Sequence, residues 1–174
     1  MSRPIWLTLA MSLDGYIADA QDGYDWITGQ GDPRLDTAKR WDFDAFTSAC
    51  DTVILGRRCY DLGQHLPFGG KRIIVGTRSV LSDSTVEVSA DVVETVKALR
   101  NEEGPAVFVF GGAQIAQAVL AQGLLDRMVI GIVPVTLGQG IRLFEPRSIT
   151  QLWTLQDVII EDGIVILDYV RRKA

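Results

Sequence analysis

The stretch from residue 106 to residue 123 reads Ala-Val-Phe-Val-Phe-Gly-Gly-Ala-Gln-Ile-Ala-Gln-Ala-Val-Leu-Ala-Gln-Gly. Its first five residues are apolar and rich in β-branched and aromatic types, which predicts a strand buried on both faces. Gly111 and Gly112 follow, and apolar side chains then recur at helical spacing until Gly123, in the position of a helix C-cap. The stretch therefore predicts a buried strand that passes through two glycines into a helix.

The junction at Gly111 and Gly112 has two interpretations. Unpaired backbone N–H groups at the start of a helix, with no Cβ nearby, suit an anionic ligand such as a pyrophosphate. Alternatively, the glycines only permit a tight bend between strand and helix. Because the junction by itself favours neither interpretation, other parts of the chain have to separate them.

Composition bounds the class of protein. Apolar residues make up 47% and charged residues 22% of the 174 residues, which is typical of a globular domain and excludes wholesale disorder. We expect one domain over residues 1–174. The apolar runs are too short to cross a membrane, and the N-terminal residues lack a signal-peptide pattern. The expected location is the cytoplasm.

The charges argue against some partners. A net charge of −5 argues against nucleic acid as a partner. Five basic residues against one acidic residue lie between positions 57 and 78, and such a segment can hold a multiply charged small ligand. Alternatively, it is a solvated surface. His65 is the single histidine, so we predict no metal site and no Ser-His-Asp apparatus.

Strands and helices are expected to alternate through the first three quarters of the chain. The predicted strands are residues 5–11, 52–55, 72–76, 86–88, 106–110, 128–133, 152–160 and 164–170. A helix is expected within residues 35–49, at least from Asp42 onward, and another after the N-cap Asp91. Asp162 and Gly163 mark a hairpin turn between the last two strands. The pattern predicts a three-layer α/β fold with a mixed sheet.

A long loop up to residue 32 carries two aromatic residues, Tyr24 and Trp26. Loops of this length are usually functional, and we expect these side chains to cover a substrate pocket. The alternative is that they pack back on the core.

Neither a G-x-G-x-x-G sequence after the first strand nor a P-loop occurs, so a Rossmann domain is not expected. Three other segments carry a resemblance. Residues 9–18 read Leu-Ala-Met-Ser-Leu-Asp-Gly-Tyr-Ile-Ala, residues 53–60 read Val-Ile-Leu-Gly-Arg-Arg-Cys-Tyr, and residues 109–114 read Val-Phe-Gly-Gly-Ala-Gln. Together they resemble the dihydrofolate reductase superfamily, most nearly its riboflavin-biosynthesis reductase branch, the RibD C-terminal domain. Residues 124–126 and 134–144 look like the closing motif of that branch.

The resemblance implies an NADPH-binding fold with about eight strands in a mixed, mostly parallel sheet, a C-terminal antiparallel hairpin, and commonly a homodimer. Ala10, Asp14, Gly15, Tyr16 and Ile17 would lie along the nicotinamide side of the cofactor. Gly56 and Arg57 would meet the pyrophosphate or the adenosine end, Thr77 and Arg78 would hold the ribose 2′-phosphate, and Gly111, Gly112, Ala113, Gln114 and Ile115 would cradle the pyrophosphate. The resemblance also implies a cis peptide bond between Gly111 and Gly112.

Two positions need separate treatment. Cys59 stands where dihydrofolate reductases usually have threonine, so a hydroxyl contact to the phosphates is missing. Asp42, four residues before Phe46, matches the position of the carboxylate on the first helix of those enzymes. It could orient or protonate a substrate, or it could be only a helix N-cap.

The leading hypothesis is an NADPH-dependent reductase that transfers a hydride to a small heterocyclic, carbonyl or imine substrate, such as a pterin or a ribosylaminopyrimidine. Arg78 would select NADPH over NADH, Asp42 would be the polar group near the acceptor, and Tyr24 and Trp26 would cover it. The alternative is a dimeric nucleotide-binding protein that keeps the fold without turnover. The residues do not discriminate between a pterin and a sugar-bearing pyrimidine.

Overall fold

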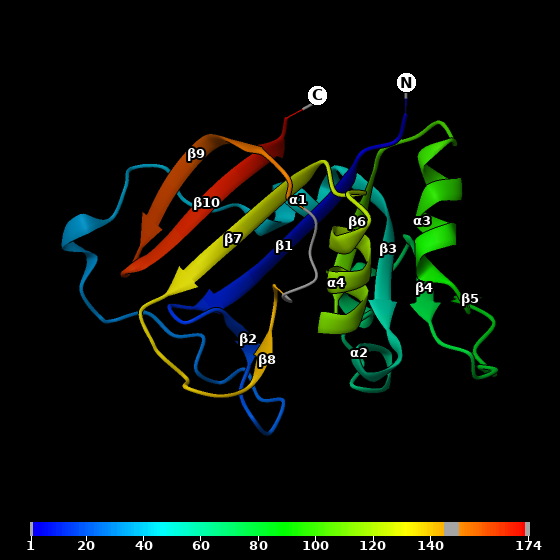
Figure 1. The fold of residues 1–174 in the computed structure, drawn as a ribbon, viewed down its shortest axis with the longest axis horizontal. Coiled ribbons are helices and arrows are strands. Elements are labelled where there is room, and N and C mark those ends of the chain that lie inside the picture. Colours follow the sequence, from blue (N-terminus) through cyan, green and yellow to red (C-terminus); the bar gives the residue numbers. More distant parts are fainter. Residues whose placement is uncertain (1, 145–149, 173–174) are drawn as a thin grey trace. The chain divides into compact units, whose positions relative to one another are not determined.

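The computed structural model describes residues 2–144 and 150–172. Eight strands form one sheet in the order β5-β4-β3-β6-β1-β7-β10-β9, and β2 and β8 form a separate pair (Figure 1). The pairs β1–β6, β3–β6, β3–β4 and β4–β5 are parallel, whereas β10 is antiparallel to both β7 and β9. The predicted fold class is confirmed: an α/β fold with a mostly parallel sheet and a C-terminal antiparallel hairpin.

The strands are β1 (Ile5–Ser12), β2 (Tyr16–Ala18), β3 (Cys50–Gly56), β4 (Arg72–Gly76), β5 (Glu87–Ser89), β6 (Ala106–Gly111), β7 (Arg127–Val133), β8 (Ile141–Arg142), β9 (Trp153–Glu161) and β10 (Ile164–Arg171). The α-helices are α1 (Phe43–Ser48), α2 (Arg57–Asp61), α3 (Val92–Arg100) and α4 (Ala113–Ala121), and the 3-10 turns are η1 (Pro33–Leu35) and η2 (Leu66–Phe68).

The contacts divide the chain into two compact units. Unit 1 consists of Met1–Leu7 and Phe43–Asp126, and unit 2 of Thr8–Asp42 and Arg127–Ala174. The chain of β1 therefore begins in unit 1 and ends in unit 2. A single domain over residues 1–174 stays a prediction.

Helices cover both faces of the parallel strands in unit 1. On one face, Gly76 of β4 lies against Val92 of α3 and Ile115 of α4. On the other face, Phe108 of β6 packs edge-on against Phe46 of α1 and Phe68 of η2, with ring centroids 5.3 and 5.8 Å apart. The apolar strand residues that the sequence predicts to be buried, such as 53–55 and 107–109, lie between these layers.

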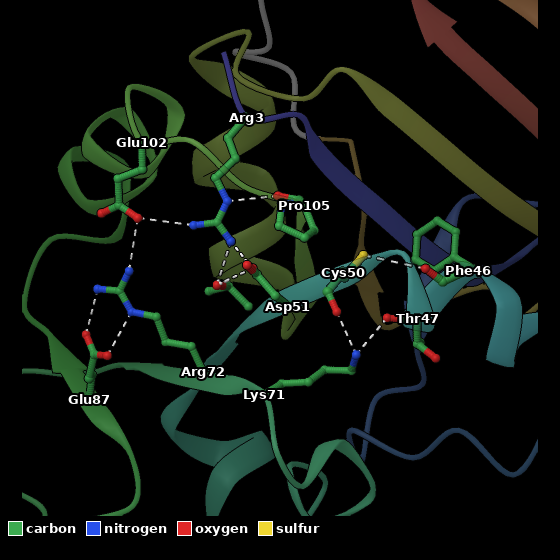
Figure 2. Close-up of polar contacts among 11 residues, drawn as sticks. Arg3, Phe46, Thr47, Cys50, Asp51, Lys71, Arg72, Glu87, Glu102 and Pro105 are labelled. Atoms are coloured by element: carbon green, nitrogen blue, oxygen red, sulfur yellow. Dashed lines mark hydrogen bonds and ion pairs between the residues drawn. The ribbon is translucent and has the colours of Figure 1, made fainter. Parts of the chain in front are cut away.

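An ion-pair network in unit 1 joins the start of β1 to β3, β4, β5 and the turn before β6 (Figure 2). The Arg3 side chain is only 3% exposed. It donates hydrogen bonds to the Pro105 carbonyl at 2.8 Å, to Thr52 Oγ1 at 2.8 Å and to Glu102 Oε2 at 3.1 Å, and it also pairs with Asp51. Because these partners come from segments far apart in sequence, Arg3 fixes the entry of the chain into β1.

In unit 2, the β9–β10 hairpin closes with the two-residue turn that the sequence predicts. Asp162 and Gly163 have φ angles of 49° and 80°, as a type I′ turn requires. The long loop is tied to this turn, since the Gln30 N–H donates to the Asp162 carbonyl at 2.8 Å and the Asp32 N–H donates to the Asp162 carboxylate at 2.8 Å.

The helix expected within residues 35–49, at least from Asp42 onward, is α1 and begins at Phe43; the amphipathic pattern over residues 35–42 does not extend it. Before α1 the chain runs along β9: Thr37 exchanges hydrogen bonds with Ile160, and the Trp41 N–H donates to Glu161. Those backbone groups are used by a strand about 120 residues away, so they cannot form helical bonds.

Three smaller features complete the fold. Residues 16–18 form β2, which pairs with β8. Residues 66–68 form a 3-10 turn. The cap of α4 is Gln122, and Gly123, with φ of 63°, is the residue after it. Among the described residues, no helix is long and apolar enough to span a membrane.

Candidate nucleotide-binding site

Three glycines end three neighbouring parallel strands in unit 1. Gly56 of β3 lies opposite Gly76 of β4, and Leu55 of β3 lies opposite Gly111 of β6. Because carboxyl ends of parallel strands meet at one edge of a sheet, the segments after these strands share that edge. Those segments hold Arg57, Thr77, Arg78 and the start of α4, to which the resemblance assigns contacts with the cofactor's phosphate groups.

The junction before α4 has the backbone form that the resemblance implies. The peptide bond between Gly111 and Gly112 is cis, and Gly111 has φ of 131°; the predicted cis bond is confirmed. Gly112 occupies the N-cap of α4 and no side chain caps the helix. The first backbone N–H groups of a helix have no intrahelical acceptor. Those of Ala113 and Gln114 therefore remain available at the positive end of the helix dipole.

The second glycine junction lies against the first. A Cβ atom placed on Gly56 would lie 3.4 Å from the Gly112 nitrogen and 3.5 Å from Ile115 Cγ1, and one placed on Gly112 would lie 3.8 Å from Cys59 Sγ. A side chain at Gly56 would thus touch the backbone of Gly112. Burial raises the pKa of the Cys59 thiol, so this side chain stays neutral beside the glycines.

Three basic side chains of the segment from residue 57 to residue 78 make contacts within the chain. Arg57 pairs with Asp61 at 2.7 Å, and Arg72 pairs with Glu87 at 2.7 Å and with Glu102 at 3.3 Å. Lys71 donates to the Thr47 and Cys50 carbonyls (Figure 2). The segment as a whole is therefore not a free positive surface.

Arg78 differs from its neighbours. Its side chain is exposed and forms no hydrogen bond or ion pair with any residue in the described ranges. Thr77, just before it, fixes the local backbone: its N–H donates to the Ser89 carbonyl at 2.9 Å and its Oγ1 accepts from the Ser79 N–H at 3.1 Å. Arg78 thus extends from an anchored turn, and within residues 2–144 and 150–172 its guanidinium has no partner.

Unit 2 carries the residues that the resemblance places near the nicotinamide. Ala10 lies half-buried in β1, Gly15 ends the turn that follows β1, and Tyr16 and Ile17 are the first two residues of β2. The Asp14 carboxylate accepts hydrogen bonds from Ser12 Oγ at 2.6 Å and from the Leu137 and Gly138 N–H groups at 3.1 and 2.7 Å. These donors, Ser12 first, lower the Asp14 pKa to about 2.

Sequence reasoning missed three of these unit 2 partners. Ser12 and Gly138 hold Asp14, and Arg142 donates to Tyr16 Oη at 3.1 Å, with its guanidinium carbon 4.6 Å from the centroid of the Tyr16 ring. The Ser-x-Asp spacing of Ser12 and Asp14 is a local signal that could have indicated their contact. Nothing in the local sequence links them to residues 137–142.

The remaining predicted site residues are also in unit 2. Tyr24 is 52% exposed. Trp26 is half-buried, and its Nε1 donates to the Gly23 carbonyl at 3.1 Å within the same loop. Asp42 is exposed and immediately precedes α1, so it stands at the N-cap position of that helix. Among the described residues, no group of three or more His, Cys, Asp or Glu side chains is arranged to hold a metal ion.

Known proteins are similar to this chain in sequence and in fold. The chain is 30% identical to the uncharacterized protein YwjB of Bacillus subtilis (strain 168), over 98% of this chain and 99% of that protein.

Two solved structures have a similar fold at 16% identity. The diaminohydroxyphosphoribosylaminopyrimidine deaminase/5-amino-6-(5-phosphoribosylamino)uracil reductase of Thermotoga maritima has a TM-score of 0.70 and aligns over 98% of this chain and 57% of its own. The dihydrofolate reductase of Enterococcus faecalis, in complex with NADP(H) and RAB-propyl, has a TM-score of 0.66 and aligns over 99% and 100%.

The family model of the RibD C-terminal domain matches residues 3–67 and 68–164 of the chain. This match spans the strand edge with the three glycines and most of unit 2. The resemblance to reductases of the riboflavin pathway is confirmed, and the chain belongs to the RibD C-terminal domain family.

Proposed function

We propose that the protein is an NADPH-dependent reductase. The observation that carries the proposal is the contact between Gly56 and Gly112, two side-chain-free junctions at the carboxyl ends of adjacent parallel strands. A Cβ at Gly56 would lie against the Gly112 nitrogen, and without it no side chain from Gly56 or Gly112 covers the backbone at the start of α4. Exposed backbone at the start of a helix suits a pyrophosphate. The proposal is supported by NADP(H) in the dihydrofolate reductase of similar fold.

The position of Arg78 supports NADPH over NADH. Arg78 follows β4, and β4 is two strands from β6, which ends at Gly111. Two strand spacings are about 10 Å, a separation that the ribose between a pyrophosphate and a 2′-phosphate can span. A guanidinium that pairs with no other described residue suits a dianionic phosphate. Thr77 would add a hydroxyl beside it.

Bound NADPH would supply the hydride. The chain would bind the cofactor and orient the acceptor, with Ala10, Gly15, Tyr16 and Ile17 along the nicotinamide. Asp42 would hold or donate a proton at its carboxyl group, and Tyr24 and Trp26 would cover the substrate. The substrate class we propose is a heterocycle such as a ribosylaminopyrimidine or a pterin, in line with the reductase named for the Thermotoga structure. We also propose a homodimer, as the resemblance implies.

Cofactor binding is tested by following NADPH fluorescence during titration of the wild-type protein and two variants. Arg78→Ala should weaken NADPH binding by about tenfold or more, the loss of a charge-assisted phosphate contact, and should leave NADH binding unchanged. Arg34→Ala is the matched control, since Arg34 is also exposed but pairs with Asp32 in the unit 2 loop. Unchanged NADPH affinity in Arg78→Ala would refute the assigned phosphate contact.

Turnover is tested by NADPH oxidation with a panel of pterins, ribosylaminopyrimidines and small carbonyl compounds. Asp42→Asn should lower kcat while leaving NADPH affinity unchanged. Binding of NADPH without oxidation by any member of the panel would favour the alternative, a nucleotide-binding protein that keeps the fold. Sedimentation equilibrium checks the proposed dimer.

A further inference from the structure

The Asp14 carboxylate joins two segments of unit 2. Three donors use most of its roughly four lone-pair positions: Ser12 Oγ at 2.6 Å, the Leu137 N–H at 3.1 Å and the Gly138 N–H at 2.7 Å. Two of them belong to a segment more than 120 residues further along the chain. Asp14 is thus directed toward the protein's own backbone.

Further contacts surround the same junction. The Leu13 N–H donates to the Val135 carbonyl at 2.8 Å, and the Leu143 N–H donates to the Gly15 carbonyl at 3.3 Å. With the pairing of β2 and β8, they align residues 12–18 with residues 135–143. Between these two segments, the Asp14 carboxylate accepts hydrogen bonds from backbone N–H groups of the opposite segment.

Tyr16 also links the two segments, residues 12–18 and residues 135–143. Its N–H donates to the fully buried Ser12 Oγ at 3.0 Å, and its hydroxyl donates to the Gly138 carbonyl at 3.2 Å. Gly138 therefore contacts Asp14 through its N–H and Tyr16 through its carbonyl. This double contact fixes the backbone of Gly15 and Tyr16, and with it the direction in which residues 15–17 leave β1.

We propose that Asp14 is a positioning residue for the nicotinamide half of the cofactor: it holds residues 15–17 against Leu137 and Gly138 and does not itself contact NADPH. This inference rests on the proposed function and replaces the direct contact that the resemblance implies for Asp14. The low pKa of Asp14 agrees with it, since the carboxylate remains ionised and able to accept both N–H groups at neutral pH.

An amide cannot replace this carboxylate. Asparagine has one acceptor oxygen, and its NH₂ group would face an N–H or hydroxyl donor. Asp14→Asn therefore loses at least one contact to the 137–138 backbone. Asp19→Asn is the matched control, because Asp19 accepts the Gln21 and Gly23 N–H groups through one oxygen, Oδ1, within its own turn.

The experiment compares NADPH with 2′,5′-ADP, a fragment that lacks the nicotinamide half, by isothermal titration calorimetry. Asp14→Asn should weaken NADPH binding by about tenfold, as for one lost charge-assisted hydrogen-bond arrangement. It should leave 2′,5′-ADP binding within twofold of the wild type. Asp19→Asn should match the wild type with both ligands.

Two results overturn the inference: unchanged NADPH affinity in Asp14→Asn, or an equal loss for both ligands, which would indicate a general structural role. Failure of both ligands to bind the wild-type protein would instead refute the proposed function.

A measurement without ligand separately tests whether Asp14 holds residues 15–17 against Leu137 and Gly138. Trypsin should cleave after the exposed Arg142 faster in Asp14→Asn than in the wild type or Asp19→Asn. Equal cleavage rates would also contradict the inference. Should Asp14→Asn fail to fold, Ser12→Ala removes one donor to the same carboxylate and is tested in its place, with a smaller expected loss.

Discussion

Arg3 and Arg72 donate hydrogen bonds to the same oxygen, Oε2 of Glu102, at 3.1 and 3.3 Å (Figure 2). Their surroundings differ, because the Arg3 side chain is almost fully buried and the Arg72 side chain is 38% exposed. The two arginines share this acceptor and differ in burial, so substituting each in turn tests how burial affects the contribution to stability.

Arg3→Ala should lower the free energy of unfolding by about 3 kcal/mol, because Thr52 and the Pro105 carbonyl lose a buried donor. Arg72→Ala should cost at most about 1 kcal/mol, as exposed ion pairs do. Urea denaturation followed by circular dichroism measures both. Similar losses for the two variants would contradict the role of burial.

Gly76 leaves little space for a side chain between α3 and α4. A Cβ there would lie 2.6 Å from both Ile115 Cδ1 and Val92 Cγ2. Gly76→Ala should destabilise the protein by about 1–3 kcal/mol through overpacking. Gly69→Ala is the control, since its Cβ would meet only the Leu66 carbonyl oxygen, at 3.8 Å. The prediction is wrong if thermal melting finds equal shifts in the two variants.

The pKa of Asp14 predicts a pH dependence. The pKa is about 2 in the folded protein and 3.8 in its ordinary state. A carboxylate with a lowered folded-state pKa stabilises the protein above its unfolded pKa, and this contribution is lost as the pH falls toward the folded-state value.

The free energy of unfolding of the wild type should therefore exceed that of Asp14→Asn at pH 6, and the difference should shrink between about pH 4 and pH 2. Urea titrations at several pH values measure it. A difference that is constant over this range would show that ionisation of Asp14 is not the cause.

The sequence predicts the site best where the signal is local. The passage from β6 through Gly111 and Gly112 into α4, and the N-cap of α3 by Asp91, depend on neighbouring residues, and both are confirmed. The hairpin turn at Asp162 and Gly163 is local in the same sense.

The failures come from contacts distant in sequence. Residues 35–42 have a helical pattern, but Thr37 bonds to Ile160 of β9. The basic segment counts five positive charges, but Arg72 meets Glu87 and Glu102 from other elements. Charge counting along the chain cannot show such pairing, and for the same reason it could not single out Arg78.

A side chain on a glycine with positive φ can cost stability in two ways, through backbone strain and through steric overlap. Comparing Gly163 with Gly31 distinguishes the two. Their φ angles are 80° and 74°. A Cβ on Gly31 would meet nothing within 4 Å, whereas one on Gly163 would lie 2.6 Å from Gln30 Oε1. Gly31→Ala should therefore cost only the backbone strain, about 1 kcal/mol.

Gly163→Ala should cost more than Gly31→Ala, because it also displaces Gln30, whose N–H anchors the long loop to Asp162. Hydrogen exchange should then show faster exchange of the Gln30 and Asp32 amides in Gly163→Ala. In Gly31→Ala the Gln30 side chain has no new atom to avoid, so these two amides should exchange as in the wild type. Equal stability and equal exchange in both variants would mean that Gln30 moves aside freely, and that the turn does not hold the loop.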